Sequence, residues 1–283
     1  MNDDAMEQPE PTQRPVVVGI DGSDAAIEAA QWAADEAVAR DVPLRLIYVV
    51  ADPAAPAPLA AVGNLRMELE YGETALRRAY AAVTALDKPV KVETAMRRGS
   101  PTAELIAESA DAVMICVGSI GIGRVLKALF GSTAAAVAKR AHCPVAIIRS
   151  RRSQPETASG FIVAAVGDAA DGGDVVGCAM QEADLRHSPV LAVGSSGVTF
   201  NKLAPIWCSR YPRVKLHTAV SQTHIADFLT RFDWQTEIQL VVIGPAGAHQ
   251  LTRLRGATHH ITGLRAEYPV LVVPPSVAPL GES

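Results

Sequence analysis

Short apolar runs alternate with longer amphipathic stretches through the first 150 residues. The run 16–21 (VVVGID) is rich in β-branched residues, and alanines then recur at helical spacing after Ser23 or Asp24, either of which is a suitable N-cap. The pattern predicts further strands at 43–50, 90–96, 112–118 and 143–149, helices at 64–86, 102–110 and 132–141, and a proline-rich loop at 52–59. Strands that alternate with helices predict βαβ units and a parallel sheet covered on both faces.

The second half of the chain repeats this order of segments. Residues 161–168, 188–194, 214–220, 239–247 and 264–274 match the strand regions of the first half in sequence, and Pro269 falls opposite Pro144. Five matching segments in one order indicate a tandem duplication. We therefore expect domains at 15–150 and 160–276, with the polar segment 151–159 as their linker.

Composition and charge narrow the classes of function. With 26 basic and 30 acidic residues the formal charge is −4, which gives no support to a nucleic-acid-binding protein. The four cysteines form no Cys-x-x-Cys pair, so neither a zinc site nor a redox pair is expected, and Cys116 lies in an apolar run typical of a buried thiol. The sequence shows no signal peptide and no apolar run of about 20 residues, so we expect a cytoplasmic protein that does not bind membranes.

Glycines around the fourth strand form a candidate phosphate-binding site. Gly118 ends the strand and Gly121 lies three residues on. Nine residues intervene before Gly131 and Ser132 open a helix, with Thr133 as a second hydroxyl. Glycines let backbone N–H groups approach phosphate oxygens, and a helix N-terminus adds unpaired donors. The alternative is a strand end followed by an ordinary N-cap. The segment is neither a Walker loop nor a Gly-x-Gly-x-x-Gly motif.

The pattern Gly-x-x-Gly, nine residues, Gly-Ser/Thr resembles the ATP-binding motif of the universal stress protein family. The opening GIDGS and the closing HCPV (142–145) are also similar to that family. The resemblance implies an α/β fold with two tandem, doubly wound, parallel five-stranded sheets of strand order 3-2-1-4-5, packed as a pseudo-dimer. Strands 1 and 4 are then neighbours at the switch point where such sheets bind ligands.

The resemblance also assigns roles at the ends of strands 1, 2 and 4. Gly19, Ile20 and Asp21 would line the nucleotide site, and Asp21 would hydrogen-bond the adenine or the ribose. Val49 and Val117 would pack on the adenine ring. A turn or helix cap is the alternative role for Asp21, and a plain core position is the alternative for both valines.

Charged residues near the motif have weaker assignments. Arg124 and Lys127 lie in the nine-residue loop and could reach the β- and γ-phosphates, although isolated surface cations are usually solvated. His142 is expected to cap a helix C-terminus. His259 and His260 are adjacent, so on a helix they would not share a face, and we expect no metal site.

The second half departs from the motif. Gly244 and Gly247 are kept, but only eight residues precede Gly256, and Ala257 replaces the Ser/Thr. Asp168 and Gly244, the counterparts of Asp21 and Gly118, are 76 positions apart, against 97 in the first half. The second long helix must therefore be shortened or lost. We expect this half to bind no nucleotide and to serve mainly in packing.

The expected function is that of an ATP-binding stress-response or regulatory protein that carries ATP with Mg²⁺ and acts through an unidentified protein partner, with a homodimer as the expected assembly. No catalytic residues are expected, because phosphoryl transfer needs a placed base and charge stabilisers, although slow incidental hydrolysis is left open. The alternatives are a cyclic-AMP binder, an adenylyltransferase or ATP pyrophosphatase whose motifs this chain lacks, and a nucleotide-free scaffold. The closing strands 144–149 and 269–273 are expected to pair antiparallel.

Overall fold

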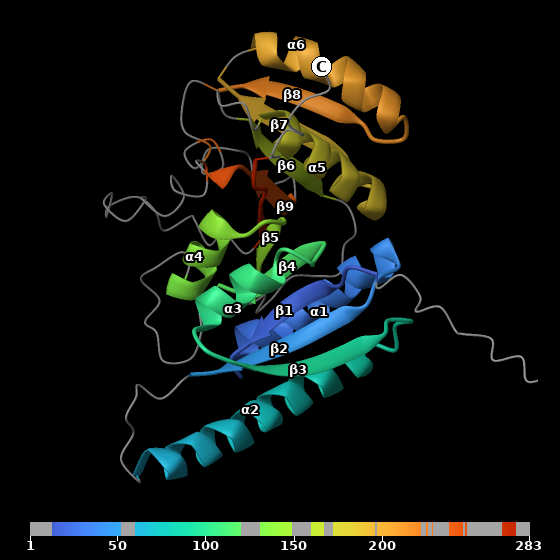
Figure 1. Cartoon of the computed structure of the whole chain (residues 1–283). Coiled ribbons are helices and arrows are strands. Elements are labelled where there is room, and N and C mark those ends of the chain that lie inside the picture. Colours follow the sequence, from blue (N-terminus) through green and yellow to red (C-terminus); the bar gives the residue numbers. More distant parts are fainter. Residues whose placement is uncertain are drawn as a thin grey trace, which may run out of the picture.

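The strands of the chain form one continuous sheet, with helices on both faces (Figure 1). The structure is a computed structural model that describes residues 13–51, 60–119, 131–148, 160–166, 172–195, 197–221, 225, 228, 238–245, 247 and 268–275, without the side chains of 60–64 and 197–203. The elements of the first half are β1 (Val16–Ile20), α1 (Asp24–Arg40), β2 (Leu44–Val50), α2 (Ala60–Thr84), β3 (Val92–Arg98), α3 (Pro101–Glu108), β4 (Met114–Gly118), α4 (Ser132–Arg140) and β5 (Val145–Ile148). Those of the second are β6 (Phe161–Val166), α5 (Gly172–Arg186), β7 (Val190–Gly194), α6 (Gly197–Arg210), β8 (Leu216–Val220), β9 (Ile238–Ile243) and β10 (Val270–Val272).

The strand order is β3-β2-β1-β4-β5-β10-β9-β6-β7-β8. Within the first half all pairings are parallel and the order is the predicted 3-2-1-4-5. The second half repeats that order from its own outer strand inward, again with parallel pairings. The doubly wound tandem fold predicted from the sequence is therefore confirmed.

The two halves meet at their closing strands. β5 and β10 pair antiparallel, with Val145 opposite Val272 and Ile147 opposite Val270. Each strand would otherwise be an exposed apolar edge, and mutual pairing removes both edges. The predicted pseudo-dimer, joined edge to edge, is confirmed, and it makes one ten-stranded sheet.

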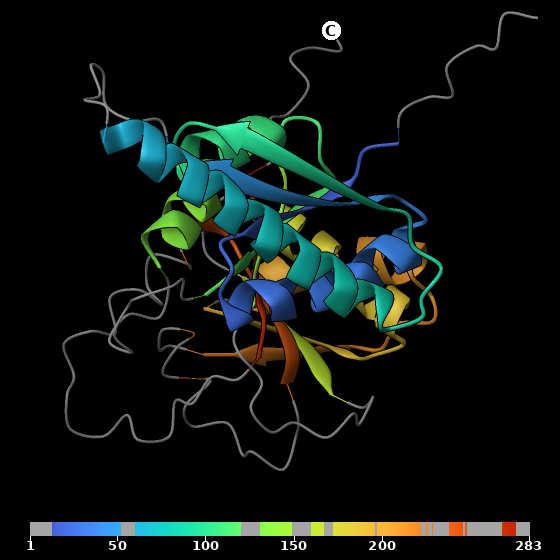
Figure 2. The same cartoon turned by 90° about the horizontal axis from the view of Figure 1, so that it is seen from below.

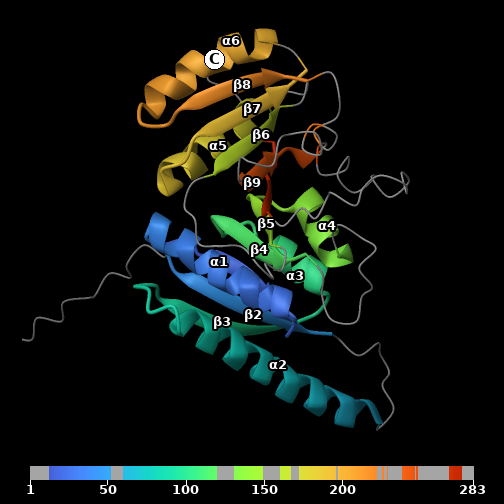
Figure 3. The same ribbon diagram turned by 180° about the vertical axis from the view of Figure 1, so that it is seen from behind.

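The helices divide between the two faces of the sheet. Residues of α1, α2, α5 and α6 pack in one apolar cluster that runs through both halves, whereas α3 and α4 pack in a second cluster on the opposite face. Figure 3 shows α1 and α5 on the same side, and Figure 2 shows α2 lying beside α1. Buried alanines of α1, such as Ala29 and Ala33, let this helix lie close to the sheet. None of the described helices is long and apolar enough to cross a membrane.

A buried ring of charges also joins the halves, and sequence reasoning missed it. In α1, Glu36 pairs with Arg40, and in α5 Glu182 pairs with Arg186 at the same spacing. Between the helices, Arg40 also pairs with Glu182 and Arg186 with Glu36, which closes the ring. Both carboxylates are almost wholly buried, and burial followed by the neighbouring Glu182 raises the pKa of Glu36. The available signal was the Glu-x-x-x-Arg pattern that recurs near the ends of the corresponding helices α1 and α5.

Element boundaries differ modestly from the predictions. β3 runs to Arg98 rather than ending at 96, because it pairs with β2 along its whole length up to Val50. α2 begins four residues before the predicted 64. α6 has 14 residues against 25 in α2, which confirms the predicted shortening. The loop 52–59 and the linker 151–159 lie outside the described residues, so the domain boundaries stay predictions.

Candidate functional site

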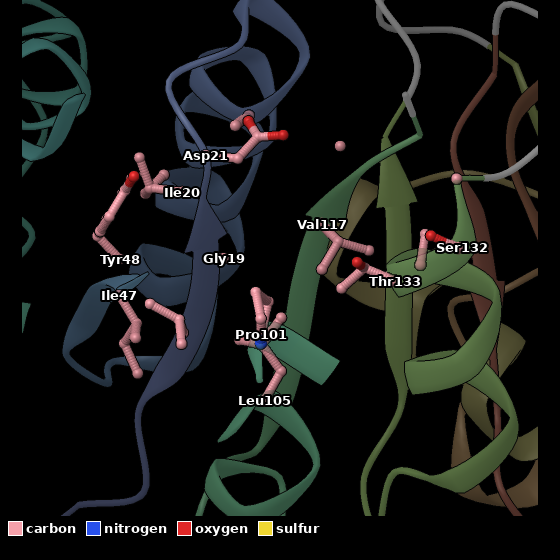
Figure 4. Close-up of a pocket in the computed structure, with 15 residues that line it drawn as sticks. Gly19, Ile20, Asp21, Ile47, Tyr48, Pro101, Leu105, Val117, Ser132 and Thr133 are labelled. Carbon is pink, nitrogen blue, oxygen red and sulfur yellow. The ribbon is translucent and has the colours of Figure 1, made fainter. Parts of the chain in front are cut away.

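A cavity of about 360 Å³ lies at the carboxyl ends of β1 and β4, where doubly wound sheets bind ligands. Its residues come from the ends of three neighbouring strands and from the beginnings of α1, α3 and α4 (Figure 4). They are Gly19, Ile20, Asp21, Ala26, Ile47, Tyr48, Val49, Pro101, Leu105, Val117, Gly118, Gly131, Ser132, Thr133 and Ala134.

Most of the site residues predicted from the sequence meet around this cavity. They are Gly19, Ile20, Asp21, Val49, Val117, Gly118, Gly131, Ser132 and Thr133. Gly121, Arg124 and Lys127 lie outside the described residues, so the structure does not place them. Contact between any of these residues and a nucleotide stays a prediction.

One end of the cavity is apolar. Ile47 and Leu105 are buried and Val117 is 5% exposed, and these side chains lie with Pro101 around one space in Figure 4. Such a lining fits an apolar part of a ligand. Sequence reasoning named Val117 alone of these residues, because the others reach the site through packing rather than through a motif.

Gly118 and Gly131 differ in why glycine is present. A β-carbon at Gly118 would lie 2.8 Å from the Ala25 carbonyl carbon, so glycine permits the start of α1 to approach the end of β4. At Gly131 the nearest atom to such a β-carbon is the Ser119 carbonyl oxygen at 3.4 Å, an ordinary contact, and φ is −64°. Nothing in the described structure therefore requires glycine at 131.

The N-terminus of α4 opens on the cavity without a side-chain cap. Gly131 is the N-cap residue, no side chain among the described residues caps the helix, and its first turn has no acidic residue. The N-cap lies at the Gly131–Ser132 step, as the alternative from the sequence placed it, and Ser132 is the first helical residue. Unpaired N–H groups and the positive end of the helix dipole make this an anion-binding position.

Asp21 forms a turn with Ser23, the residue that precedes α1. Its Oδ1 accepts hydrogen bonds from the Ser23 N–H (2.9 Å) and the Ser23 hydroxyl (2.6 Å), while Ser23 Oγ accepts from the Ala26 N–H at 3.2 Å. Ser23, and not Asp24, is thus the N-cap. Asp21 has the turn role that the sequence left as the alternative, and it also lines the cavity.

Helix α2 contacts the same turn, which sequence reasoning did not foresee. The Tyr71 hydroxyl donates to the Asp21 carbonyl oxygen at 3.4 Å, and Arg78 Nη1 donates to the Gly22 carbonyl oxygen at 3.3 Å. Arg78 also pairs with Asp24 at 3.5 Å. Tyr71 and Arg78 are seven residues apart, which places them on one face of the helix.

Tyr48 connects α2 with the cavity wall. Its ring is 7% exposed and meets the Tyr71 ring edge-on, with centroids 6.1 Å apart. Burial, followed by the nearby Glu68, Tyr71 and Asp21, raises the pKa of the Tyr48 phenol. The phenol therefore keeps its proton at neutral pH.

Other candidate groups supply no second site among the described residues. No group of three or more possible metal ligands occurs there, and Cys116 and Cys143 are buried, as expected for Cys116. α4 ends with Ala141 as its C-cap, and His142 is exposed, with its backbone N–H donating to Ser109 Oγ at 2.9 Å. His259 and His260 lie outside the described part of the chain.

In the second half, Gly244 and Gly247 follow β9 as predicted, whereas Asp168, Gly256 and Ala257 lie outside the described residues. The prediction that this half binds no nucleotide is therefore untested. The absence of a hydroxyl residue at 257 is a fact of the sequence alone.

Comparison with known proteins agrees with this architecture. The sequence profile described as the universal stress protein family matches residues 13–149. A universal stress protein of Mycobacterium tuberculosis H37Rv is 43% identical over 272 residues, covering 93% of this chain and 97% of the relative, and another from the same strain is 37% identical over 269 residues, covering 91% and 95%. The crystal structure of a universal stress protein from Archaeoglobus fulgidus DSM 4304 superposes with a TM-score of 0.69 at 15% identity, covering 94% of this chain and all of that one. The chain therefore belongs to the universal stress protein family, as a tandem two-domain member.

Proposed function

We propose that the first half binds one ATP, together with Mg²⁺, in the cavity at the ends of β1 and β4. The observation that carries the proposal is the N-terminus of α4, which no described side chain caps and whose N-cap is Gly131, a glycine that no contact with described residues requires. Close approach of a phosphate to the backbone is a reason for glycine at that position.

The cavity offers suitable groups in the order that a nucleotide needs. The apolar end around Leu105 and Val117 would take the adenine, and Gly131, Ser132 and Thr133 would take the phosphates. Asp21, at the end of β1, lies on the other side of the cavity from Ser132 and Thr133 in Figure 4, and its carboxylate would bind the ribose. The Mg²⁺ would be held largely by phosphate oxygens and water, because it keeps much of its hydration shell.

We propose a binding and regulatory role rather than catalysis. The described lining contains no lysine, arginine or histidine to stabilise a transferring phosphoryl group or to act as a base near neutral pH. ATP-dependent contact with a protein partner in the cytoplasm, with two chains assembled as a homodimer, is the working hypothesis for its role in the stress response.

Calorimetric titration with ATP, and separately with cyclic AMP, tests this function. We expect one ATP per chain, and we expect Gly131→Val to weaken binding at least tenfold because a branched side chain keeps phosphate from the backbone. Ser132→Ala should weaken binding less, and Ser209→Ala, an exposed serine of α6 away from the cavity, should have no effect.

Three results would contradict the proposal. Undiminished ATP affinity in Gly131→Val would mean that the phosphates lie elsewhere. Tighter binding of cyclic AMP than of ATP would favour the cyclic nucleotide as ligand. ATP turnover above about one per second would indicate an enzyme.

A further inference from the structure

We propose that Tyr71 of α2 is a positioning residue for the nucleotide, which acts by fixing the Asp21 turn and thereby sets the preference for a ribose over a deoxyribose. The inference rests on the proposed function. It assigns a ligand-dependent role to a helix that contributes none of the described residues lining the cavity.

The turn after β1 is held from two sides. Toward α1, the Asp21 carboxylate is bound through Oδ1 to the N–H and hydroxyl of Ser23. Toward α2, the carbonyl oxygens of Asp21 and Gly22 accept hydrogen bonds from Tyr71 and Arg78. Both successive carbonyls are thus tied to one helix, so a shift of α2 moves the turn with it.

Tyr71 and Gly22 are in close contact. Gly22 has a φ of +85°, and a β-carbon there would lie 2.4 Å from the Tyr71 hydroxyl oxygen and 3.0 Å from its ring carbon Cζ. The backbone at Gly22 lies directly against Tyr71, and no side chain at position 22 would fit between the backbone and the tyrosine. The position of the Tyr71 hydroxyl therefore determines where the backbone of the turn lies.

The Asp21 carboxylate has capacity for a ligand. Its contacts with described residues use Oδ1 alone, and the residue is exposed at the cavity. A carboxylate accepts several hydrogen bonds, so Oδ2 can accept one from a ribose hydroxyl. Selectivity follows because a 2′-deoxy ligand would leave that acceptor without a partner, whereas a displaced carboxylate would not distinguish the two sugars.

Tyr80 supplies a matched control on the same helix. Tyr71 and Tyr80 are both 45% exposed, but Tyr80 lines a separate groove between α2 and β3. Replacing either by phenylalanine removes one phenolic hydroxyl from α2. Only the change at 71 removes a contact with the turn.

The experiment measures ATP and 2′-deoxy-ATP dissociation constants for the full-length protein, Tyr71→Phe and Tyr80→Phe. We expect the wild-type protein to prefer ATP. Tyr71→Phe should weaken ATP binding by about two- to tenfold, the effect of one neutral hydrogen bond, and should change 2′-deoxy-ATP binding less. Tyr80→Phe should retain both constants.

Hydrogen exchange of the nucleotide-free protein provides a readout that does not depend on the ligand. Peptides covering residues 19–26 should exchange faster in Tyr71→Phe than in the wild type or in Tyr80→Phe, because the turn opens more often. Tyr71→Leu, which removes the ring as well, should increase exchange further.

Different results would contradict ATP binding and the role of Tyr71. Failure of the wild-type protein to bind ATP overturns the proposed function. If the wild type binds ATP, an equal loss for both sugars in Tyr71→Phe, or unchanged affinity and unchanged exchange, overturns the positioning role alone.

Discussion

Gly118 lies so close to Ala25 that an added β-carbon would come within 3.0 Å of both the Ala25 carbonyl oxygen and its β-carbon. This contact packs the start of α1 against the end of β4, and both elements contribute residues to the cavity lining. Gly118→Ala should lower the free energy of unfolding by about 1–3 kcal/mol, as overpacking of a dense interior does. Denaturant titration measures the change.

Gly131→Ala is the matched control for that substitution. Its β-carbon would meet the Ser119 carbonyl oxygen at 3.4 Å, and the backbone at Gly131 suits any residue. We expect a change within about 0.5 kcal/mol. Equal destabilisation by both substitutions would show that the Gly118–Ala25 contact is not the cause.

Ser23 caps α1 through its side chain, and its loss should be measurable. Ser23→Ala removes the bond to the Ala26 N–H and should lower stability by about 1 kcal/mol. Ser100, the N-cap of α3, makes no side-chain capping bond, so Ser100→Ala should cost much less. Similar losses at the two positions, measured by thermal unfolding, would argue against the cap.

Removal of Glu182 should be severe, because it leaves Arg40 and Arg186 buried without one of their two carboxylates. We expect Glu182→Ala to destabilise the protein by about 3–5 kcal/mol. The exposed pair of Arg66 and Glu70 provides the comparison, and Glu70→Ala should cost less than about 1 kcal/mol. A small loss for Glu182→Ala in chemical denaturation would mean that water replaces the missing partner.

The cysteines should differ sharply in reactivity. Burial raises the pKa of Cys143 to about 12, and burial also raises that of Cys116 strongly, so at pH 9 only about one Cys143 thiol in a thousand is ionised. Cys208 is exposed on α6. Iodoacetamide should therefore label Cys208 first in the native protein, as read by mass spectrometry of tryptic peptides. Early labelling of Cys143 would contradict its burial.

Candidate site residues could be predicted from the sequence where they lie at the carboxyl ends of strands. Asp21 and Gly118 each end an apolar run, and the strand order that the family resemblance implies makes these two strands neighbours. Parallel neighbours bring their carboxyl ends together, so both residues could be expected at one cavity, where the structure places them. The pairing of β5 with β10 followed in the same way from two apolar closing strands that needed cover.

Residues that reach the cavity or its turn through packing could not be predicted. Tyr71 contacts Asp21 because α2 packs against β2 and α1, and Leu105 lies beside Gly19 because α3 packs against β1 and β2. Neither relation leaves a spacing in the sequence. The charge ring of Glu36 and Glu182 depends likewise on the approach of helices from different halves.

The antiparallel junction of β5 and β10 has a consequence for the chain as a thermodynamic unit. A fragment cut between the halves would expose an apolar strand edge at Val145–Ile148, would divide the shared apolar layer beneath α1 and α5, and would leave Glu36 facing Arg40 alone. The two halves should therefore melt together in one cooperative transition. In this arrangement the second half would stabilise the first even though its own sequence has Ala257 in place of the motif's Ser/Thr.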